Sequence, residues 1–217
     1  MNTTTTSTSR RKFLRGGCLA AAAAGLTLCG GGALAAAYQP RIDLPAESLG
    51  APGAKGRILV AYATKAGSTA ETALRIAETL ANSGAAVDVC PAGAAPDPAG
   101  YSAVILGSAI RIGNILPEAL DFVQNNLTAL KAVHFSVFIL CMTLAEDSEA
   151  NRQTVSAYLD PLRALIRPAE EGLFAGMMDL SRLKLYERAM ILAMKTPTGD
   201  FRDWGKINSW AESAVRS

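Results

Sequence analysis

Short aliphatic runs alternate with longer segments of helical periodicity from residue 57 onward, and this alternation restricts the fold more than any other feature of the chain. Strands covered on both faces of a sheet have this apolar composition. Five such runs lie at 57–63, 85–90, 102–108, 134–142 and 172–176. Apolar residues recur at helical spacing over about 70–81, 116–123, 148–166, 180–194 and 204–215. The pattern predicts right-handed βαβ units, and so an α/β fold with a parallel sheet and helices on both faces.

The loop after the first run has the composition of an anion site. The stretch "TKAGST" carries hydroxyl groups at Thr64, Ser68 and Thr69 and a glycine at Gly67, with a helix directly behind. A phosphate placed there would meet free backbone N–H groups and the positive end of the helix. Ser68 and Glu71 also fit a capping box, so an ordinary, well-capped turn is the alternative. The stretch matches neither the P-loop nor the dinucleotide pattern, so it does not support a site for ATP or NAD.

Five strands with a ligand loop after the first suit the doubly wound order 2-1-3-4-5. In such sheets ligands bind outside the carboxyl ends of the strands, so we expect the site in the loops after strands 1, 3 and 4. The third and fourth runs end in "GSAIRIGN" and "CMTLAEDSE". Small and apolar residues beside a phosphate pocket suit a flat ring edged by backbone groups, and plain connections are the alternative.

Several stretches resemble a known family. "ILVAYATKAGSTAETA" is similar to the phosphate loop of flavodoxins, T/S-x-T-G-x-T: Thr64, Gly67 and Thr69 match, while Ala66 stands where the pattern has a hydroxyl. "YSAVILGSAIRIGNILPEALDFVQ", "LFAGMMDLSRLKLYERAMILAMK" and "GDFRDWGKINSWA" resemble the flavodoxin-like branch that contains menaquinone-dependent protoporphyrinogen dehydrogenase. The resemblance covers residues 57–215.

The resemblance implies FMN as the cofactor and assigns residues to its parts. The phosphate would bind Thr64, Lys65, Ala66, Gly67, Ser68 and Thr69. The ring would lie between one loop of Ser108, Ala109, Ile110, Arg111, Ile112 and Gly113 and another of Cys141, Met142, Thr143 and Leu144. Neither ring loop contains the Trp or Tyr found beside the ring in many flavodoxins. We therefore expect aliphatic side chains or Met142 to contact the ring.

The first 37 residues have the composition of a targeting segment. Arg10 and Arg11 in "SRRKFL" match a twin-arginine export signal, and residues 33–35 or 35–37 offer a small-residue cleavage site. The run 16–37 is 22 residues long, about the length that spans a bilayer, so an anchor is the alternative. We expect a periplasmic or otherwise exported protein, with a linker at 38–55 and the flavodoxin-like domain at 56–217.

Charge and the few reactive side chains exclude several classes of function. The segment 1–37 carries four basic and no acidic residues; without it, 17 basic face 19 acidic residues, a net charge of −2. Nucleic acid is therefore not an expected partner. Cys90 and Cys141 would be three strand spacings apart, about 14 Å, which is too far for a disulfide. The sole histidine, His134, opens the fourth strand, opposite the expected site. With no acid–base set near the loops, the cofactor would carry any chemistry.

Two further segments allow alternative interpretations. In "GDFRDW", Asp203 fits a helix N-cap and Arg202 a carboxylate partner, although the cluster could also bind a substrate or partner. The helix predicted over 180–194 combines Lys184 and Arg188 with Leu, Ile and Met. It could pack wholly on the domain, or it could offer an apolar, basic face to a membrane or a quinone.

Together these observations favour an exported, FMN-binding oxidoreductase that passes electrons or hydride between a reduced donor and a quinone or redox-protein acceptor. An electron carrier without a substrate of its own is the alternative. A receiver-like module is disfavoured because the first strand ends in Ala63 and Thr64, not in acidic residues. Export would also separate the domain from haem synthesis, which faces the cytoplasm in the relatives, so porphyrinogen is not carried over as the substrate.

Overall fold

The computed structural model describes residues 42–50, 56–194 and 196–216. The predicted signal lies outside the described residues. Residues 42–182 and 196–216 form one compact unit, and Leu183–Met194 belong to another. In the described part of the chain, no helix is long and apolar enough to cross a membrane.

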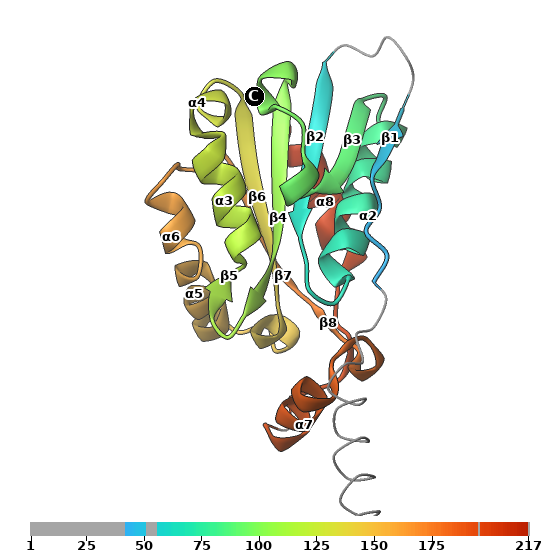
Figure 1. Cartoon of the computed structure of the whole chain (residues 1–217), viewed down its shortest axis with the longest axis vertical. Coiled ribbons are helices and arrows are strands. Elements are labelled where there is room, and N and C mark those ends of the chain that lie inside the picture. Colours follow the sequence, from blue (N-terminus) through green and yellow to red (C-terminus); the bar gives the residue numbers. More distant parts are fainter. Residues whose placement is uncertain (1–41, 51–55, 195, 217) are drawn as a thin grey trace, which may run out of the picture. The chain divides into compact units, whose positions relative to one another are not determined.

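Five parallel strands form the centre of the sheet in the larger unit (Figure 1). In chain order they are β2 (Arg57–Ala63), β3 (Ala86–Pro91), β4 (Ala103–Arg111), β6 (His134–Cys141) and β7 (Glu171–Ala175). Their spatial order is β3-β2-β4-β6-β7, with every neighbouring pair parallel. This is the predicted order 2-1-3-4-5.

The predicted count of five strands is wrong, because the described residues form a sheet of seven. β1 (Glu47–Leu49) pairs antiparallel with β3 at the sheet edge, and β5 (Asn114–Ile115) pairs antiparallel with β4. These strands have only three and two residues, too few for a period-2 pattern to be recognised. β1 also lies within the stretch predicted to be a linker, so part of that stretch joins the sheet.

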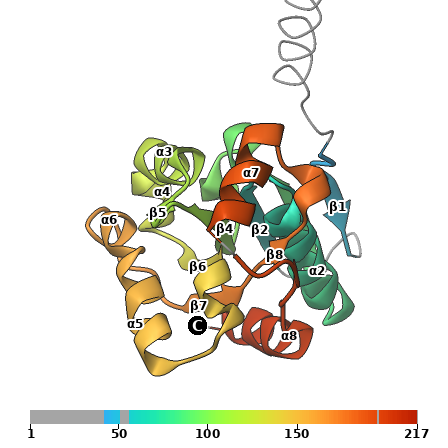
Figure 2. The same cartoon turned by 90° about the horizontal axis from the view of Figure 1, so that it is seen from below.

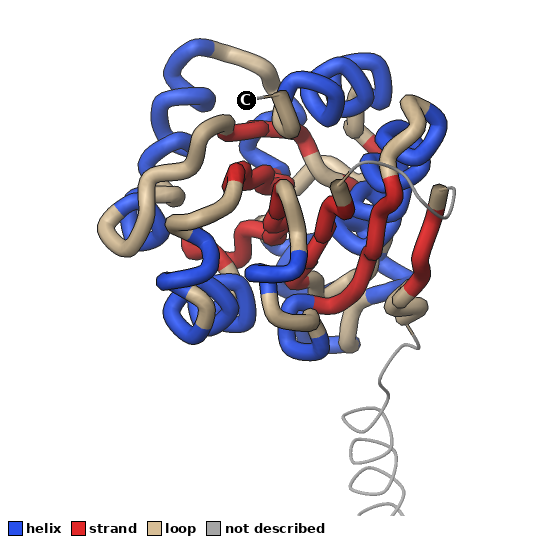
Figure 3. Tube along the Cα trace, turned by 90° about the horizontal axis from the view of Figure 1, so that it is seen from above, coloured by secondary structure: helices blue, strands red, loops and turns tan. Residues whose placement is uncertain are grey.

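Helices cover both faces of the sheet (Figures 2 and 3). Along β2, alternate side chains enter opposite cores, as the strand period of two requires. Ile58 and Val60 pack in the core beneath α2 (Ser68–Asn82) and α8 (Trp204–Ser213). Leu59 and Ala61 pack in the other core. That core lies beneath α3 (Pro117–Asn125), α4 (Leu127–Leu130), α5 (Glu149–Ala157) and α6 (Asp160–Arg163).

Short elements complete the unit. The predicted helix over 148–166 is divided into α5 and α6, with Pro161 in the first turn of α6, where its missing N–H is tolerated. Two strands pair outside the main sheet, β8 (Met177–Met178) and β9 (Gly199–Asp200). Single 3-10 turns lie at η1 (Ala92–Ala94), η2 (Pro98–Gly100), η3 (Met142–Ala145) and η4 (Leu180–Arg182).

Asp88 on β3 binds the edge strand to the sheet. Its carboxylate accepts hydrogen bonds from the hydroxyl groups of Ser48 and Tyr101, at 2.6 and 2.7 Å, and from the guanidinium of Arg57, at 2.8 Å. Burial alone would raise the pKa of Asp88, but these three donors outweigh it and hold the pKa below its usual value. Nearby, the hydroxyl of Tyr62 donates to the carbonyl of Pro45 at 2.9 Å.

The described part of the second unit contains one helix, α7 (Leu185–Ala193). The backbone N–H of Lys184 donates to the Glu187 carboxylate at 2.9 Å, which caps the helix start. Large apolar side chains on this segment are exposed, with Tyr186 at 62% and Leu192 at 63%. An amphipathic surface role for the segment stays a prediction.

Candidate functional site

The loop between β2 and α2 and the first residues of the helix, 64–69, form a backbone turn that we call the cradle. Gly67, the N-cap residue of α2, has φ 88° and ψ −18°, a left-handed conformation that favours glycine. Its N–H donates to the hydroxyl of Thr64 at 3.0 Å, which closes the loop on itself. No side chain caps the helix here. The first N–H groups of a helix have no partner within it, so this end can receive an anion.

Thr69 provides an independent sign of a missing ligand. Its side chain is fully buried, and its Oγ1 has no hydrogen-bond partner among the described residues. A buried hydroxyl without a partner costs about 1–3 kcal/mol. In a loop with free helical N–H groups, an anion's oxygen could accept this hydroxyl's hydrogen. The residues present therefore fit a phosphate group.

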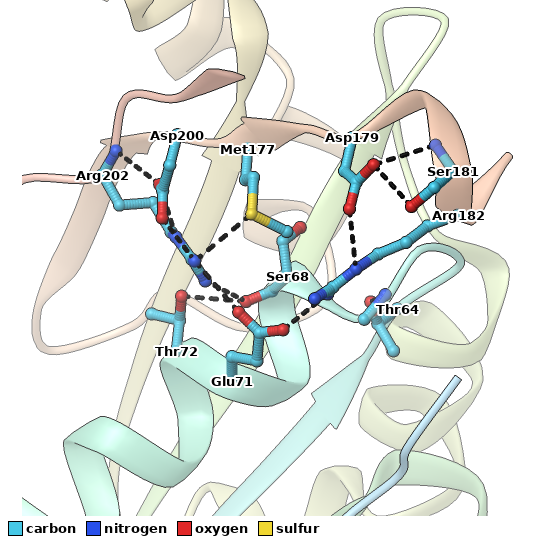
Figure 4. A network of polar contacts seen from close by, with 11 residues as sticks. Thr64, Ser68, Glu71, Thr72, Met177, Asp179, Ser181, Arg182, Asp200 and Arg202 are labelled. Atoms are coloured by element: carbon cyan, nitrogen blue, oxygen red, sulfur yellow. Dashed lines mark hydrogen bonds and ion pairs between the residues drawn. The ribbon is translucent and has the colours of Figure 1, made fainter. Parts of the chain in front are cut away.

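The predicted capping box is wrong. Ser68 lies inside the helix and is not its cap, and the Glu71 carboxylate turns instead to two arginines (Figure 4). Arg182 Nη1 is 2.5 Å from one carboxylate oxygen of Glu71, and Arg202 Nη2 is 3.0 Å from the other. These arginines lie more than 100 residues away in sequence, so a local sequence pattern could not reveal that both of them bind Glu71.

Arg202, which belongs to the C-terminal part of the chain, binds the start of α2. Its side chain is only 3% exposed and pairs with Asp200 at 2.7 Å. It also donates to the carbonyl of Ser68 at 3.2 Å and lies 4.5 Å from the ring centre of Trp204. Its hydrogen bond holds the pKa of Asp200 below the usual value, despite burial. The predicted Arg–carboxylate pair is confirmed, and so is the cap: the Asp203 carboxylate accepts from the Lys206 N–H at 3.0 Å.

Lys65 joins the cradle to the neighbouring helix. Its ammonium group forms an ion pair with Glu118, in the first turn of α3. The hydrogen bond from Lys65 is the main reason that the pKa of Glu118 lies below its usual value. Both side chains are 45% exposed, so the pair contributes little to stability. It does hold a cation beside the loop.

The second predicted loop is mostly strand. Ser108, Ala109, Ile110 and Arg111 belong to β4, and only Ile112 and Gly113 form the turn to β5. Both turn residues have positive φ, 49° and 72°, as a two-residue type I′ hairpin turn requires. Ser108 is fully buried, and its hydroxyl accepts from the N–H of Leu116 at 3.1 Å. Ile112 is 80% exposed, so the turn presents an apolar tip.

The third predicted loop begins at Cys141, the last residue of β6, and continues into η3. Leu144 is buried, whereas Met142 and Thr143 are partly exposed. Cys90 and Cys141 are both buried free thiols. Burial raises the pKa of Cys90 to about 11, with a further contribution from Asp88.

The strand register brings the three loops to one edge of the sheet. Ala63 at the end of β2 pairs with Ser108 of β4, and Ala109 pairs with Leu140 near the end of β6. The cradle, the hairpin and η3 therefore follow neighbouring strand ends. His134 lies at the opposite end of β6, as predicted. The loop residues at 64–69, 108–113 and 141–144 include no His, Asp or Glu.

A family model described as a flavodoxin domain matches residues 59–204. The chain belongs to the flavodoxin domain family. The matched segment contains all three loops. Among curated proteins, this flavodoxin-family chain is 25% identical to the protoporphyrinogen IX dehydrogenase [quinone] of Escherichia coli K12, over 71% of this chain and 92% of the relative.

The solved structures that match this chain include flavodoxins. Oxidised flavodoxin 1 from Bacillus cereus is 18% identical, with a TM-score of 0.45, over 73% of this chain and 97% of its own. A Fusobacterium nucleatum flavodoxin bound to flavin mononucleotide is 12% identical, with a TM-score of 0.40, over 73% of this chain and 96% of its own.

Proposed function

We propose that this flavodoxin-family chain binds FMN and acts as an exported oxidoreductase, passing electrons or hydride between a reduced donor and a quinone or redox-protein acceptor. The cradle carries the proposal: a left-handed glycine, an uncapped helix start and the unpartnered, buried hydroxyl of Thr69 lie together at the carboxyl edge of the sheet. Family membership supports FMN as the occupant. The name of the Escherichia coli relative supports a quinone acceptor.

Each part of the site would have a distinct role. The Thr64 hydroxyl accepts the N–H of Gly67 and so closes the turn, while the N–H groups of Ser68 and Thr69 and the Thr69 hydroxyl would bind the phosphate. Ala66 offers no side-chain oxygen, so its contribution would be its backbone N–H. The strand ends at 108–113 and 141–144 would edge the ring, with Ile112 and Met142 as apolar contacts. When bound, FMN supplies the electron or hydride transfer, and the protein's part is to orient the ring and exclude water.

The test is flavin binding by the full chain. Titration with FMN, riboflavin and FAD, followed by quenching of flavin fluorescence, should give the tightest binding for FMN. Riboflavin, which lacks the phosphate, should bind more weakly. Equal affinity for FMN and riboflavin would show that the cradle does not bind the phosphate, and binding of none of the three flavins would refute the proposal.

A carrier without a substrate of its own is the second candidate. It is favoured by the lack of His, Asp and Glu among the loop residues at 64–69, 108–113 and 141–144, since substrate chemistry commonly needs a proton donor or acceptor. Anaerobic reduction of the flavin-loaded chain, followed by addition of a menaquinone analogue, separates the two. Catalytic turnover supports the oxidoreductase, whereas oxidation by a redox protein alone supports the carrier.

Export through the twin-arginine pathway is a separate part of the proposal. It is supported by Arg10 and Arg11 and by the fact that this route carries folded proteins, so FMN could be inserted in the cytoplasm beforehand. Cell fractionation should find the chain outside the cytoplasm, either soluble or anchored by the N-terminal segment. The double variant R10K/R11K, which keeps the charge, should remain in the cytoplasm; normal export of that variant would exclude the pathway.

A further inference from the structure

Arg182 lies over the glycine of the cradle. A Cβ added at Gly67 would be 3.3 Å from Nη1 of Arg182. Arg182 ends η4, a segment far from the cradle in sequence and outside the three loops described above. The structure thus places a guanidinium beside a helix start that no side chain caps.

Two carboxylates hold this guanidinium in place. Nη1 contacts Glu71 at 2.5 Å, and Nε lies 3.3 Å from Asp179 (Figure 4). Asp179 is itself fixed by the N–H and hydroxyl of Ser181, at 2.8 and 2.7 Å. The side chain of Arg182 is 34% exposed. An arginine has five N–H donors, and these two contacts leave donors for a further acceptor.

Arg202 differs from Arg182 in this respect. Arg202 is almost fully buried and bonds to Asp200, Glu71 and the carbonyl of Ser68. Its donors are therefore used within the protein, where they stabilise the backbone of the cradle. Arg182 keeps an exposed fraction next to Gly67. Of the two arginines, Arg182 is the one able to reach a ligand.

We propose that Arg182 binds the phosphate of the cofactor, as a charged partner additional to the backbone cradle. The proposal rests on the proposed function, because the ligand chemistry is the phosphomonoester that distinguishes FMN from riboflavin. The unpartnered Thr69 hydroxyl at the same helix start is the independent observation that points to an anion there. Glu71 and Asp179 act as positioning residues that fix the guanidinium before the ligand arrives.

The test compares FMN with riboflavin for the full chain and three variants. Arg182→Ala should weaken FMN binding about ten- to hundredfold, the range for a hydrogen bond to a charged group, and change riboflavin binding by less than about threefold. Arg182→Lys keeps a point charge and should lose less. Arg75→Ala is the matched control, since Arg75 is an exposed α2 arginine paired with Glu78 at 3.5 Å; it should leave both affinities unchanged.

The outcomes separate the two proposals. If the wild type binds FMN and Arg182→Ala binds it equally well, Arg182 is not a phosphate ligand, while the proposed function stands. An equal loss of FMN and riboflavin affinity would also overturn the role of Arg182, because riboflavin has no phosphate and the substitution would then have disturbed the flavin site as a whole. If Arg182→Ala does not fold, as judged by circular dichroism, the ratio of FMN affinity to riboflavin affinity is measured for Arg182→Lys instead. A ratio equal to that of the wild type would then overturn the role of Arg182. Failure of the wild type to bind any flavin would refute the function itself.

Discussion

The hairpin turn at Ile112 and Gly113 carries strain that a substitution should release. Ile112 has φ 49°, and a β-branched residue is a clear outlier in that region. A left-handed conformation costs a residue with a Cβ about 1–2 kcal/mol. The side chain is 80% exposed, so it recovers little of this by burial. Asparagine tolerates the conformation far better and is a preferred residue in type I′ turns.

Ile112→Asn should therefore stabilise the ligand-free protein. We expect the free energy of unfolding to rise by about 1 kcal/mol, which shifts Tm upward by about 2–4 °C for a chain of this size. Urea titration and thermal melts of the full chain, followed by circular dichroism, measure both quantities. Leu44→Asn is the control: Leu44 is 52% exposed and has no positive φ, so the same change of side chain should give no gain.

The same variant should weaken flavin binding. Ile112 is an apolar residue in a strained turn at the expected ring edge, so we expect its side chain to contact the ring. Loss of that contact should weaken FMN and riboflavin equally, by about three- to tenfold, equivalent to about 1 kcal/mol of apolar burial. A stability no higher than that of the wild type would refute the strain argument. Higher stability with unchanged flavin affinity would refute the contact with the ring.

Three other substitutions or treatments test particular contacts. Gly67→Ala should weaken FMN binding more than tenfold, because its Cβ would lie 2.9 Å from Ile42 and 3.3 Å from Arg182 at a φ of 88°; unchanged binding in a fluorescence titration would contradict this. Asp88→Asn should cost about 1–3 kcal/mol at neutral pH. Since the pKa of Asp88 is lowered in the folded state, this stabilisation is present above the unfolded pKa of about 3.9 and is lost as pH falls through the folded value. Urea titrations should therefore show the difference between wild type and variant shrinking below about pH 4, and a constant difference would exclude the linkage. Cys90, whose pKa is raised to about 11, should react with a thiol reagent much more slowly in the native than in the urea-unfolded chain, and equal rates would show that it is not buried.

The five parallel strands could be predicted because burial on both faces makes each of them an aliphatic run. β1 and β5 could not, since a strand this short pairs through its backbone and leaves no side-chain pattern. The stretch "ESL" contains two polar residues and lies among Pro and Gly residues. Only the exposed edge of β3 gives it a partner.

The cradle was predictable from local residues, whereas its surroundings were not. Thr64 and Gly67 lie three residues apart, and their hydrogen bond is a local event. Glu71 fits a capping box by spacing, yet its carboxylate forms ion pairs with two arginines from distant segments. Nothing near Arg182 in sequence signals a position beside Gly67. That contact depends on the path of the chain after β7.

The central claim is that the cradle holds FMN, and the most direct measurement is the visible spectrum of the purified full chain after addition of FMN and removal of unbound flavin by gel filtration. The account predicts that a flavin spectrum elutes with the protein at close to one FMN per chain, and that riboflavin added in the same way is lost. A folded protein that elutes colourless after FMN addition would contradict it.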